Sequence, residues 1–217
     1  LYSCEIDSEE VNVNDYQEFT KKLADRRARD RMLKDAQSEA CVYLSQFDVN
    51  PYYINCENGT YDLEHYSFHF YRAEDYLSLK TNCVYILPNN VGEYKCERFA
   101  QFLNEIMQDD KDKLDYLQRA LGYSLVGTPT EECMFFAYGK TTRNGKGTLF
   151  NTIQNILGDY ATTVSSQLIC KGNKNDVNTA NPAVCALKGK RFVVMSEIPD
   201  KASIDENIVK KICTIAS

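Results

Sequence analysis

The spacing of apolar side chains changes several times along the chain, and each change predicts a different element. Residues 14–46 contain no proline or glycine, and their apolar positions recur at helical intervals, which predicts helix. Four arginines lie in the middle of this region: Arg26, Arg27, Arg29 and Arg31. Because acidic residues are interspersed with them, we expect a solvated, ion-paired helix face, and contact with phosphate groups is the alternative.

Residues 51–71 follow the two-residue period of strands instead. Asn58-Gly59 separates two strand-like runs, and this dipeptide favours a tight hairpin turn because both turn positions adopt positive φ. His65 and His69 fall on one face of the next predicted strand. The two imidazoles could bind a metal, but without a third ligand nearby we favour a partly exposed strand face.

A pair of amphipathic helices is predicted to end the first part of the chain. In order, we expect a short helix, an apolar segment and two longer helices, at residues 73–79, 83–87, 95–108 and 110–125. Gly127-Thr128-Pro129-Thr130 has the composition of a linker, so we place a domain boundary after residue 130. Residues 1–130 are therefore predicted to form a mainly helical α+β domain with a hairpin near residues 52–71.

From residue 131 the pattern is that of an α/β fold. Apolar runs predict strands at residues 134–138 and 191–195, and helices are expected at 145–157, from 182, and at 203–212. A polar loop covers residues 171–181. Strand, loop, helix, crossover and strand in this order predict a parallel sheet. Residues 131–217 are therefore predicted to be the second domain.

Composition limits the class of protein. The chain has 217 residues, of which 43% are hydrophobic, and it contains no run of about 20 apolar residues that would span a membrane. Residues 1–131 carry 14 basic and 24 acidic side chains (net −10), whereas residues 132–217 carry 11 and 7 (net +4). This asymmetry is typical of two modules with different partners, and a basic triphosphate-binding loop explains it equally well.

Nine cysteines are scattered along the chain without zinc-type spacing: Cys4, Cys41, Cys56, Cys83, Cys96, Cys133, Cys170, Cys185 and Cys213. Their number is odd, and several lie in apolar runs. We interpret them as small buried hydrophobic residues in a reducing compartment, which predicts a cytoplasmic protein. The first residues lack the apolar run of a signal peptide, and Leu1 in place of Met suggests an internal piece of a longer protein.

The segment from Gly139 to Thr148 (GKTTRNGKGT) has the layout of a phosphate-binding loop between a strand and a helix. Backbone N–H groups at a helix N-terminus hold phosphate oxygens, and a lysine adds a positive charge. The strict pattern G-x-x-x-x-G-K-[ST] is not met, because one extra residue separates the glycines and Gly147 takes the hydroxyl position. A turn with an incidental lysine is the alternative. The nucleotide-binding candidates are Gly139, Arg143, Asn144, Gly145, Lys146, Gly147 and Thr148.

The strand predicted at residues 191–195 is followed by Ser196-Glu197. An apolar strand that ends in a carboxylate, downstream of a phosphate loop, is the Walker B arrangement, and a parallel sheet brings both strand ends to one edge. Glu197 would then polarise the attacking water, and Glu197 and Thr148 are the candidate Mg²⁺ ligands. By itself, Glu197 would be interpreted as a solvent-exposed glutamate.

Lys210-Lys211 form a basic pair on the last predicted helix. Contact with DNA and a favourable interaction with the C-terminal end of the helix dipole are equally good interpretations.

The motifs together resemble the helicase core of phage- and plasmid-encoded DNA primase–helicases, superfamily 3 helicases related to the poxvirus primase–helicase. Asn144-Gly145-Lys146 is similar to the family's Walker A motif, and Ser196-Glu197 to its Walker B motif. Upstream, FDVNPYYINCENGTYDL and YLQRALGYSLVG resemble the region between primase and helicase. The resemblance covers residues 30–217.

This resemblance implies a truncated AAA+-like P-loop ATPase core that uses ATP and Mg²⁺. The full-length protein would be an ATP-dependent helicase that forms a hexameric ring and translocates on single-stranded or forked DNA in a bacterial cell or a phage-infected host. Lys146 would bind phosphate and Glu197 would be the catalytic carboxylate. The sensor asparagine and arginine finger are expected beyond Ser217 and the primase domain before Leu1, so the chain by itself would bind nucleotide and hydrolyse it slowly.

Two other functions fit parts of the sequence. Another P-loop NTPase such as a kinase would need an arginine-rich lid, and the polar loop at residues 171–181 contains no arginine. A non-enzymatic module for oligomerisation or DNA binding would use residues 1–131 as a collar beside a vestigial ATP site.

Overall fold

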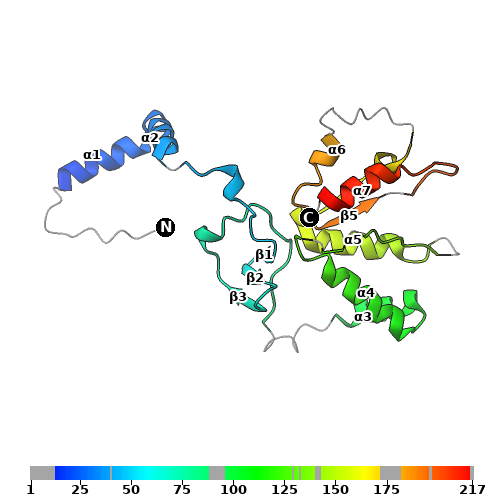
Figure 1. The fold of residues 1–217 in the computed structure, drawn as a ribbon. Coiled ribbons are helices and arrows are strands. Elements are labelled where there is room, and N and C mark those ends of the chain that lie inside the picture. Colours follow the sequence, from blue (N-terminus) through cyan, green and yellow to red (C-terminus); the bar gives the residue numbers. More distant parts are fainter. Residues whose placement is uncertain are drawn as a thin grey trace. The chain divides into compact units, whose positions relative to one another are not determined.

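The computed structural model describes residues 13–39, 41–87, 96–128, 130–131, 133–139, 143–171, 182–195 and 197–215 (Figure 1). The chain divides into two compact units, Leu1–Gln46 and Phe47–Ser217. The predicted features at Cys4, Ser196 and residues 172–181 lie outside the described residues. Of the helices in the described ranges, none has the length and apolar character needed to cross a membrane.

The first unit is helical, as predicted. It contains two helices and one 3₁₀ turn: α1 (Val13–Ala24), α2 (Arg26–Glu39) and η1 (Leu44–Gln46). The guanidinium of Arg29 donates to the carbonyls of Leu23 and Ala24, each at 2.8 Å, and thereby satisfies carbonyls at the end of α1. The predicted helical region is thus interrupted at Asp25, where side-chain hydrogen bonds replace the helical ones.

The arginines of α2 lie on an exposed face: Arg26, Arg27, Arg29 and Arg31. Arg26 pairs with Asp30 at 4.0 Å, one helical turn further on. This arrangement agrees with the predicted solvated face, and such exposed pairs contribute little to stability.

The second unit begins with an antiparallel sheet of three strands: β1 (Tyr53–Cys56), β2 (Gly59–Asp62) and β3 (Ser67–His69). The predicted hairpin is confirmed, but its register pairs Cys56 with Gly59, so the turn residues are Glu57 and Asn58 and neither has positive φ. Gly59 has a φ of 151°, and a Cβ there would lie 2.4 Å from the carbonyl oxygen of His69. The turn prediction was wrong by one residue because Gly59 is needed for the close approach of β3.

The segment after the sheet contains a 3₁₀ turn, η2 (Ala73–Asp75), and an extended stretch near Tyr85. That stretch is held by the side chain of Asn58, which accepts from Tyr85 N at 2.7 Å and donates to Tyr85 O at 2.9 Å. The ring of Tyr85 stacks on Tyr61 and Phe68, with centroids 4.6 and 5.0 Å apart. The Asn58 amide extends backbone contacts between this segment and the hairpin, in which Thr81 N donates to Asn55 O at 2.8 Å and Glu57 N donates to Cys83 O at 2.9 Å.

The predicted helix pair is confirmed as α3 (Glu97–Met107) and α4 (Lys111–Tyr123), which lie beside each other in Figure 1. The side chain of Asp110 caps α4 by accepting from Lys113 N at 3.2 Å, and it also pairs with Lys113 Nζ at 2.7 Å. These contacts hold the carboxyl in its charged form and lower the pKa of Asp110.

The remaining elements alternate between helix and strand: α5 (Lys146–Leu157), η4 (Gly158–Tyr160), β4 (Ala161–Val164), η5 (Ser166–Ile169), α6 (Pro182–Cys185), β5 (Phe192–Met195) and α7 (Glu206–Ile215). β4 and β5 are parallel, with Ala161 opposite Phe192 and Val164 opposite Met195. The predictions of β5 and of the helices in this region are confirmed, but the parallel partner of β5 is β4 and not the strand predicted at residues 134–138. The mixed helix and sheet content agrees with the predicted class at this coarse level.

The strand predicted at residues 134–138 is not formed, which corrects that prediction. Residues 133–139 have no regular structure, and Phe135, Phe136 and Tyr138 are 52%, 67% and 90% exposed. A strand needs a neighbouring edge for its backbone N–H and C=O groups, and within the described residues β5 pairs with β4 instead.

A hydrophobic core in the second unit joins residues from distant parts of the chain. Its buried members are Ile54, Cys56, Leu157 and Tyr160. Partly buried side chains pack around them: Tyr61, Leu63, Leu79, Tyr85, Leu125, Ile153, Ala161 and Phe192. The predicted boundary after residue 130 stays a prediction, and this core packs across it.

The interpretation of the cysteines was partly wrong. Among the described cysteines, all of which are free thiols, only Cys56 is buried, and Cys41, Cys96, Cys133 and Cys185 are exposed. Cys133 is exposed because the apolar run that follows it does not pair as a strand.

Candidate functional site

α5 begins where the phosphate loop was predicted to meet a helix. Gly145 is the N-cap with a φ of 84°, and Arg143 also has a left-handed φ of 57°. The first described helical hydrogen bond runs from Leu149 N to Gly145 O at 3.0 Å. Residues 140–142 of the predicted loop lie outside the described residues. The described part of the loop therefore turns sharply and feeds directly into a helix N-terminus.

Three of the predicted loop residues lie together at this turn. Lys146 is half-buried, and its Nζ donates to Asn144 Oδ1 at 2.9 Å. A Cβ placed on Gly139 would lie 2.0 Å from Asn144 Nδ2 and 3.7 Å from Lys146 Nζ. The absence of a side chain at Gly139 thus lets the two ends of the loop approach each other, with the ammonium group beside them.

The two other glycines of the loop have opposite surroundings. A Cβ on Gly145 would lie 2.6 Å from Ile106 and 3.2 Å from Phe102, so α3 packs directly against the loop. A Cβ on Gly147 would meet nothing within 4 Å. The first turn of α5 is therefore covered by α3 on one side and open at Gly147, beside the exposed Thr148.

Glu197 follows β5, as predicted, and is exposed. Its backbone carbonyl accepts a hydrogen bond from the Ser166 hydroxyl at 2.8 Å. β5 packs on α5 through Phe192 and Phe150, whose ring centroids are 6.2 Å apart. In the part of the chain that the structure describes, no hydrogen bond or ion pair joins Glu197 to Lys146.

Lys210 and Lys211 are exposed on α7. Because α7 continues to Ile215 and its last turn contains no basic residue, the interpretation as a C-terminal charge pair was wrong. The DNA-contact interpretation stays a prediction.

Arg191 was missed by sequence reasoning. Its guanidinium donates from Nη1 to Leu125 O at 2.5 Å and from Nη2 to Tyr53 O at 2.7 Å, and it lies 4.7 Å from the ring centroid of Tyr160. It therefore joins the end of α4, strand β1 and the core beside β5. Burial lowers the pKa of Arg191, and burial raises the pKa of the Tyr160 phenol. A basic residue just before an apolar strand was the available signal.

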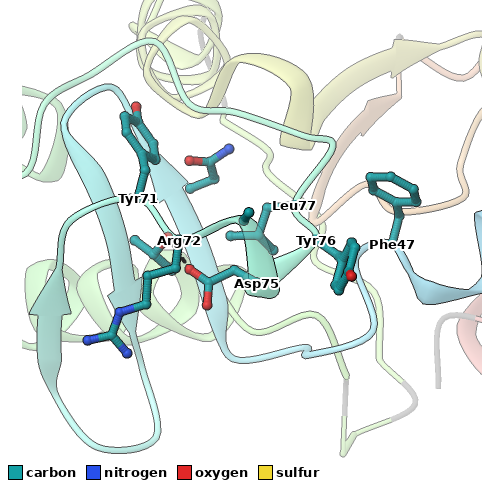
Figure 2. A pocket seen from close by; sticks show the side chains of 9 residues that line it. Phe47, Tyr71, Arg72, Asp75, Tyr76 and Leu77 are labelled. Atoms are coloured by element: carbon teal, nitrogen blue, oxygen red, sulfur yellow. Dashed lines mark hydrogen bonds between the residues drawn. The ribbon is translucent and has the colours of Figure 1, made fainter. Parts of the chain in front are cut away.

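A cavity of about 310 Å³ lies between β1, β2 and the segment around η2 (Figure 2). Aromatic side chains of Phe47, Tyr71 and Tyr76 line it, together with the polar Asn55 and Asp75. Sequence reasoning did not predict this cavity, because its lining depends on how the turn at η2 folds back over the sheet.

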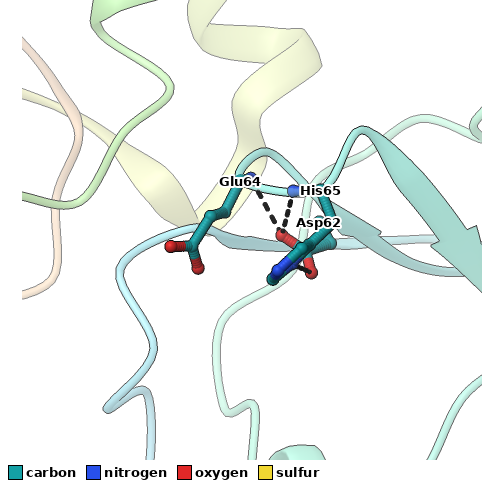
Figure 3. Close-up of side chains that lie close together, drawn as sticks. All are labelled: Asp62, Glu64 and His65. Carbon is teal, nitrogen blue, oxygen red and sulfur yellow. Dashed lines mark hydrogen bonds and ion pairs between the residues drawn. The ribbon is translucent and has the colours of Figure 1, made fainter.

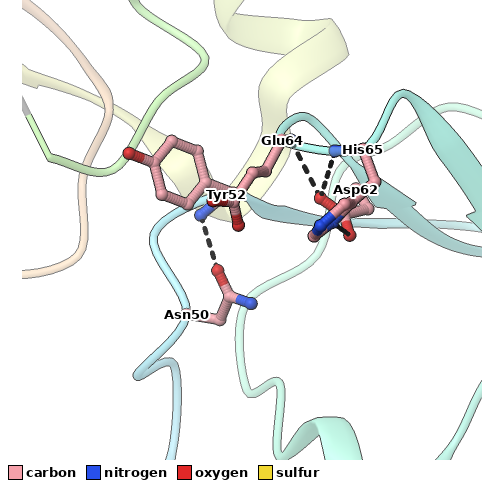
Figure 4. A network of polar contacts seen from close by, with 5 residues as sticks. All are labelled: Asn50, Tyr52, Asp62, Glu64 and His65. Carbon is pink, nitrogen blue, oxygen red and sulfur yellow. Dashed lines mark hydrogen bonds and ion pairs between the residues drawn. The ribbon is translucent and has the colours of Figure 1, made fainter.

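Asp62, Glu64 and His65 form a cluster at the turn before β3 (Figure 3). Asp62 accepts from the backbone N–H groups of Glu64 and His65 at 2.9 and 3.2 Å and from His65 Nδ1 at 2.8 Å. Nearby, Asn50 accepts from Tyr52 N at 2.9 Å (Figure 4). These hydrogen bonds shape the turn, so the cluster has a structural explanation.

The two histidines have separate partners. His69 Nδ1 lies 3.0 Å from Phe70 O and 3.7 Å from Asp75 Oδ2, and His69 is not part of the cluster around His65. His65 lies in the turn before β3 and His69 lies in the strand, so the two histidines do not share a strand face as predicted.

Burial by itself would raise the pKa of Asp62, but its hydrogen bonds from His65 and Glu64 hold that pKa below its usual range. The same hydrogen bond and the charge of Asp62 raise the pKa of His65.

Sequence comparison relates this chain to known proteins. Residues 5–108 match the family described as D5 N terminal like. A protein of Acanthamoeba polyphaga mimivirus that is named as a helicase, L207/L206, is 30% identical over 168 residues, covering 77% of this chain and 17% of that protein. The chain is related to the viral primase–helicases. Primase D5 of Fowlpox virus (strain NVSL) is 27% identical over 164 residues, covering 70% of this chain and 19% of that protein.

The chain spans less than one fifth of the length of each of these two curated proteins. The family match ends at residue 108, before the predicted phosphate loop. The mimivirus alignment reaches further, because a stretch covering 77% of 217 residues includes residues 139–148 wherever it begins. The relationship to these proteins therefore extends beyond the family match and includes the predicted phosphate loop.

Proposed function

We propose that this chain is the ATP-binding part of a replicative DNA primase–helicase, with Lys146 as its phosphate-binding residue. The observation that carries the proposal is the position of Lys146: it is half-buried in the first turn of α5, directly after the left-handed Gly145 and beside Gly139. Helix N-termini and lysine ammonium groups both attract phosphate oxygens. The names of the viral relatives support the same class of function.

The residues at this turn fit a nucleotide triphosphate. The N-cap Gly145 has no side chain to engage the first N–H groups of α5, and the space beside Gly147 is open. Asn144 holds Lys146 Nζ at 2.9 Å and thereby orients the ammonium group before a ligand arrives. ATP bound with Mg²⁺ would supply the phosphoanhydride whose hydrolysis drives movement. Arg143, exposed at the rim, adds positive charge.

The roles of the carboxylate and the hydroxyl are part of the proposal. Glu197 would hold the attacking water, and Thr148 would offer its hydroxyl to Mg²⁺ with Glu197 as a further ligand. β5, which precedes Glu197, is parallel to β4 and packs on α5 through Phe192. The packing of β5 on α5 supports a position of Glu197 on the side of the sheet where α5 begins.

Nucleotide binding tests the proposal directly. We expect a fluorescent ATP analogue to bind the chain in the presence of Mg²⁺, and Lys146→Ala to weaken binding at least about tenfold. Lys188→Ala is the matched control, because Lys188 is an exposed lysine outside the loop. Equal affinity of the two variants, with both folded by circular dichroism, would overturn the assignment of Lys146.

DNA is the proposed polymer partner, and the full-length protein is proposed to act as a hexameric ring. Lys210 and Lys211 are the proposed phosphate contacts on α7. We expect Lys210→Gln/Lys211→Gln to reduce the salt dependence of single-stranded DNA binding by about 0.7 per lost contact. The adjacent lysines Lys21 and Lys22 of α1, also exposed, provide the control pair. An unchanged salt slope would remove α7 from the DNA site.

A second candidate function is an assembly collar, which the exposed apolar side chains of α1 and α2 favour. Tyr16, Phe19, Met32 and Leu33 are 47% to 59% exposed. Exposed apolar side chains of this size promote association. Light scattering without nucleotide separates the two candidates: a collar should form oligomers under these conditions, and a nucleotide-dependent ring should not.

A further inference from the structure

Two side chains with hydrogen-bond acceptors, Asn55 and Asp75, line the cavity beside η2. Asn55 Oδ1 is buried and has no hydrogen-bond partner, although Asn55 Nδ2 donates to Leu79 O at 2.9 Å. A buried amide oxygen without a partner costs free energy, so such an atom calls for an explanation. Asn55 also lines the cavity, but Oδ1 itself is closed off from solvent, so this amide marks a polar part of the cavity wall.

The second acceptor is the carboxylate of Asp75, whose side chain is only 11% exposed. Oδ2 accepts from the Thr60 hydroxyl at 3.1 Å and lies 3.7 Å from His69 Nδ1. Within the described residues, no lysine or arginine pairs with this carboxylate. Arg72 also lines the cavity but directs its guanidinium away from Asp75 in Figure 2. Among the described residues, the carboxylate of Asp75 therefore has the Thr60 hydroxyl and the His69 imidazole as partners, and no permanently charged group pairs with it.

Aromatic rings complete the lining. Phe47 and Tyr76 meet edge to face, with centroids 5.8 Å apart, and Tyr71 lines the cavity while its hydroxyl donates to Cys56 O at 2.6 Å. Aromatic faces attract cations through their quadrupole, and the effect grows when water is excluded. Rings and a carboxylate together favour a positively charged organic group.

The net charge of the region around the cavity also favours a cationic ligand. Residues 47–87 contain six acidic and two basic side chains. A negatively charged ligand such as a nucleic-acid phosphate would be repelled here, whereas a cation would be attracted.

We propose that this cavity is a binding site for an organic cation, and that the guanidinium group of an arginine side chain on a partner peptide is the group it accepts. A guanidinium offers five N–H donors in one plane, which suits a carboxylate, and it stacks on aromatic rings. The volume of about 310 Å³ lies at the lower end of the range for small-ligand sites and exceeds what such a side chain needs. The site is separate from the proposed phosphate loop.

N-acetyl-arginine amide is the probe, and its binding to the full chain can be followed by NMR. We expect saturable chemical-shift changes at residues 71–77 and at the Asn55 side-chain amide, with a dissociation constant in the millimolar range. N-acetyl-citrulline amide has nearly the same shape without the charge, and we expect at least about fivefold weaker binding. Equal binding of the two compounds would mean that the cavity does not recognise the charge, and the absence of a saturable shift at these residues would mean that it does not bind the probe. Either result would overturn the proposal.

Substitutions in the cavity lining give a second test, because the proposal predicts which of them weaken binding of the cation and which tighten it. Asp75→Asn should weaken binding about tenfold, whereas Glu74→Gln, the same charge change at an exposed neighbour, should leave it within about twofold. Arg72→Gln should tighten binding of the cation, because it removes a like charge from the lining. If Asp75→Asn disturbs folding, Arg72→Gln still decides the matter, since weaker binding in that variant would indicate an anion site.

Discussion

The guanidinium carbon of Arg191 lies 4.7 Å from the ring centroid of Tyr160, so a charged side chain rests on a buried phenol at the centre of the second unit. Both side chains also reach backbone groups far away in the sequence. Arg191 binds carbonyls 66 and 138 residues away, and Tyr160 donates to Leu79 O and accepts from Asn55 N, each at 3.2 Å. The pair therefore joins segments that the chain order keeps apart.

Arg191→Lys should destabilise the second unit by about 2–4 kcal/mol. A lysine ammonium cannot donate to two separate carbonyls and stack on a ring at the same time, and unsatisfied buried carbonyls are costly. Urea unfolding followed by circular dichroism measures the loss. Arg119→Lys, at an exposed position of α4, is the control and should change the unfolding free energy by less than about 0.5 kcal/mol. Equal stability of the two variants would contradict the structural role of Arg191.

The two glycines at the start of α5 should respond in opposite ways to alanine. Gly145→Ala forces a Cβ into a left-handed residue with Ile106 2.6 Å away, and we expect a loss of about 1–3 kcal/mol. Gly147→Ala meets nothing within 4 Å and lies inside a helix, so it should be neutral or stabilise by up to about 1 kcal/mol. Thermal unfolding of both variants checks the pair, and a similar change in both would show that α3 does not pack on this turn.

The Asp62–His65 contact predicts a pH window for stability. The pKa of His65 is raised on folding, so its contribution is complete below the ordinary value of 6.5 and is lost as pH rises through the folded value. The pKa of Asp62 is lowered, so its contribution is complete above 3.8 and is lost as pH falls through the folded value. The contact should therefore stabilise most between about pH 4 and 6.5.

Urea midpoints of the natural chain and of His65→Gln measure this window. Their difference should be largest near about pH 5.5 and should vanish near about pH 8.5, where the imidazole is neutral. Glu64→Gln changes a nearby exposed charge without removing the contact and serves as the control. A difference that grows toward high pH would refute the assignment.

Cysteine reactivity should separate Cys56 from Cys133. Burial raises the pKa of the Cys56 thiol to about 11, whereas Cys133 is exposed. Because the thiolate is the reactive form, Cys56 should react with iodoacetamide at least about 100-fold more slowly at neutral pH. Peptide mass spectrometry after brief labelling gives both rates, and labelling in urea should make them similar. Rapid native labelling of Cys56 would show that the core around it opens readily.

Sequence patterns predicted the elements whose signal is local. Helices α3, α4 and α5 carry apolar side chains at helical spacing, and β5 is a clear apolar run. The strand at residues 134–138 failed because a strand exists only with a partner, and periodicity does not report where the partner is. β4 was missed because four residues, Ala161–Val164, are too few to show a period.

The functional residues likewise divide into those that a local motif predicts and those that depend on residues far apart in the sequence. The spacing of the motif predicted Gly139, Asn144 and Lys146 as site residues, and these three residues lie together in the structure. Arg191 and the cavity beside η2 could not be predicted, because their partners come from residues far apart in sequence. The unpartnered oxygen of Asn55 depends on the fold of the whole sheet region.

The core that unites Ile54 and Cys56 with Leu157 and Tyr160 has a practical meaning for dissecting this chain. An expression boundary placed after residue 130 would cut the core in two and leave each product with an uncovered apolar face. A boundary between Gln46 and Phe47 follows the division into compact units instead and keeps the core whole. Separate expression of the parts before and after residue 130 should therefore yield insoluble products, and producing the two parts together should restore solubility because each covers the apolar face of the other.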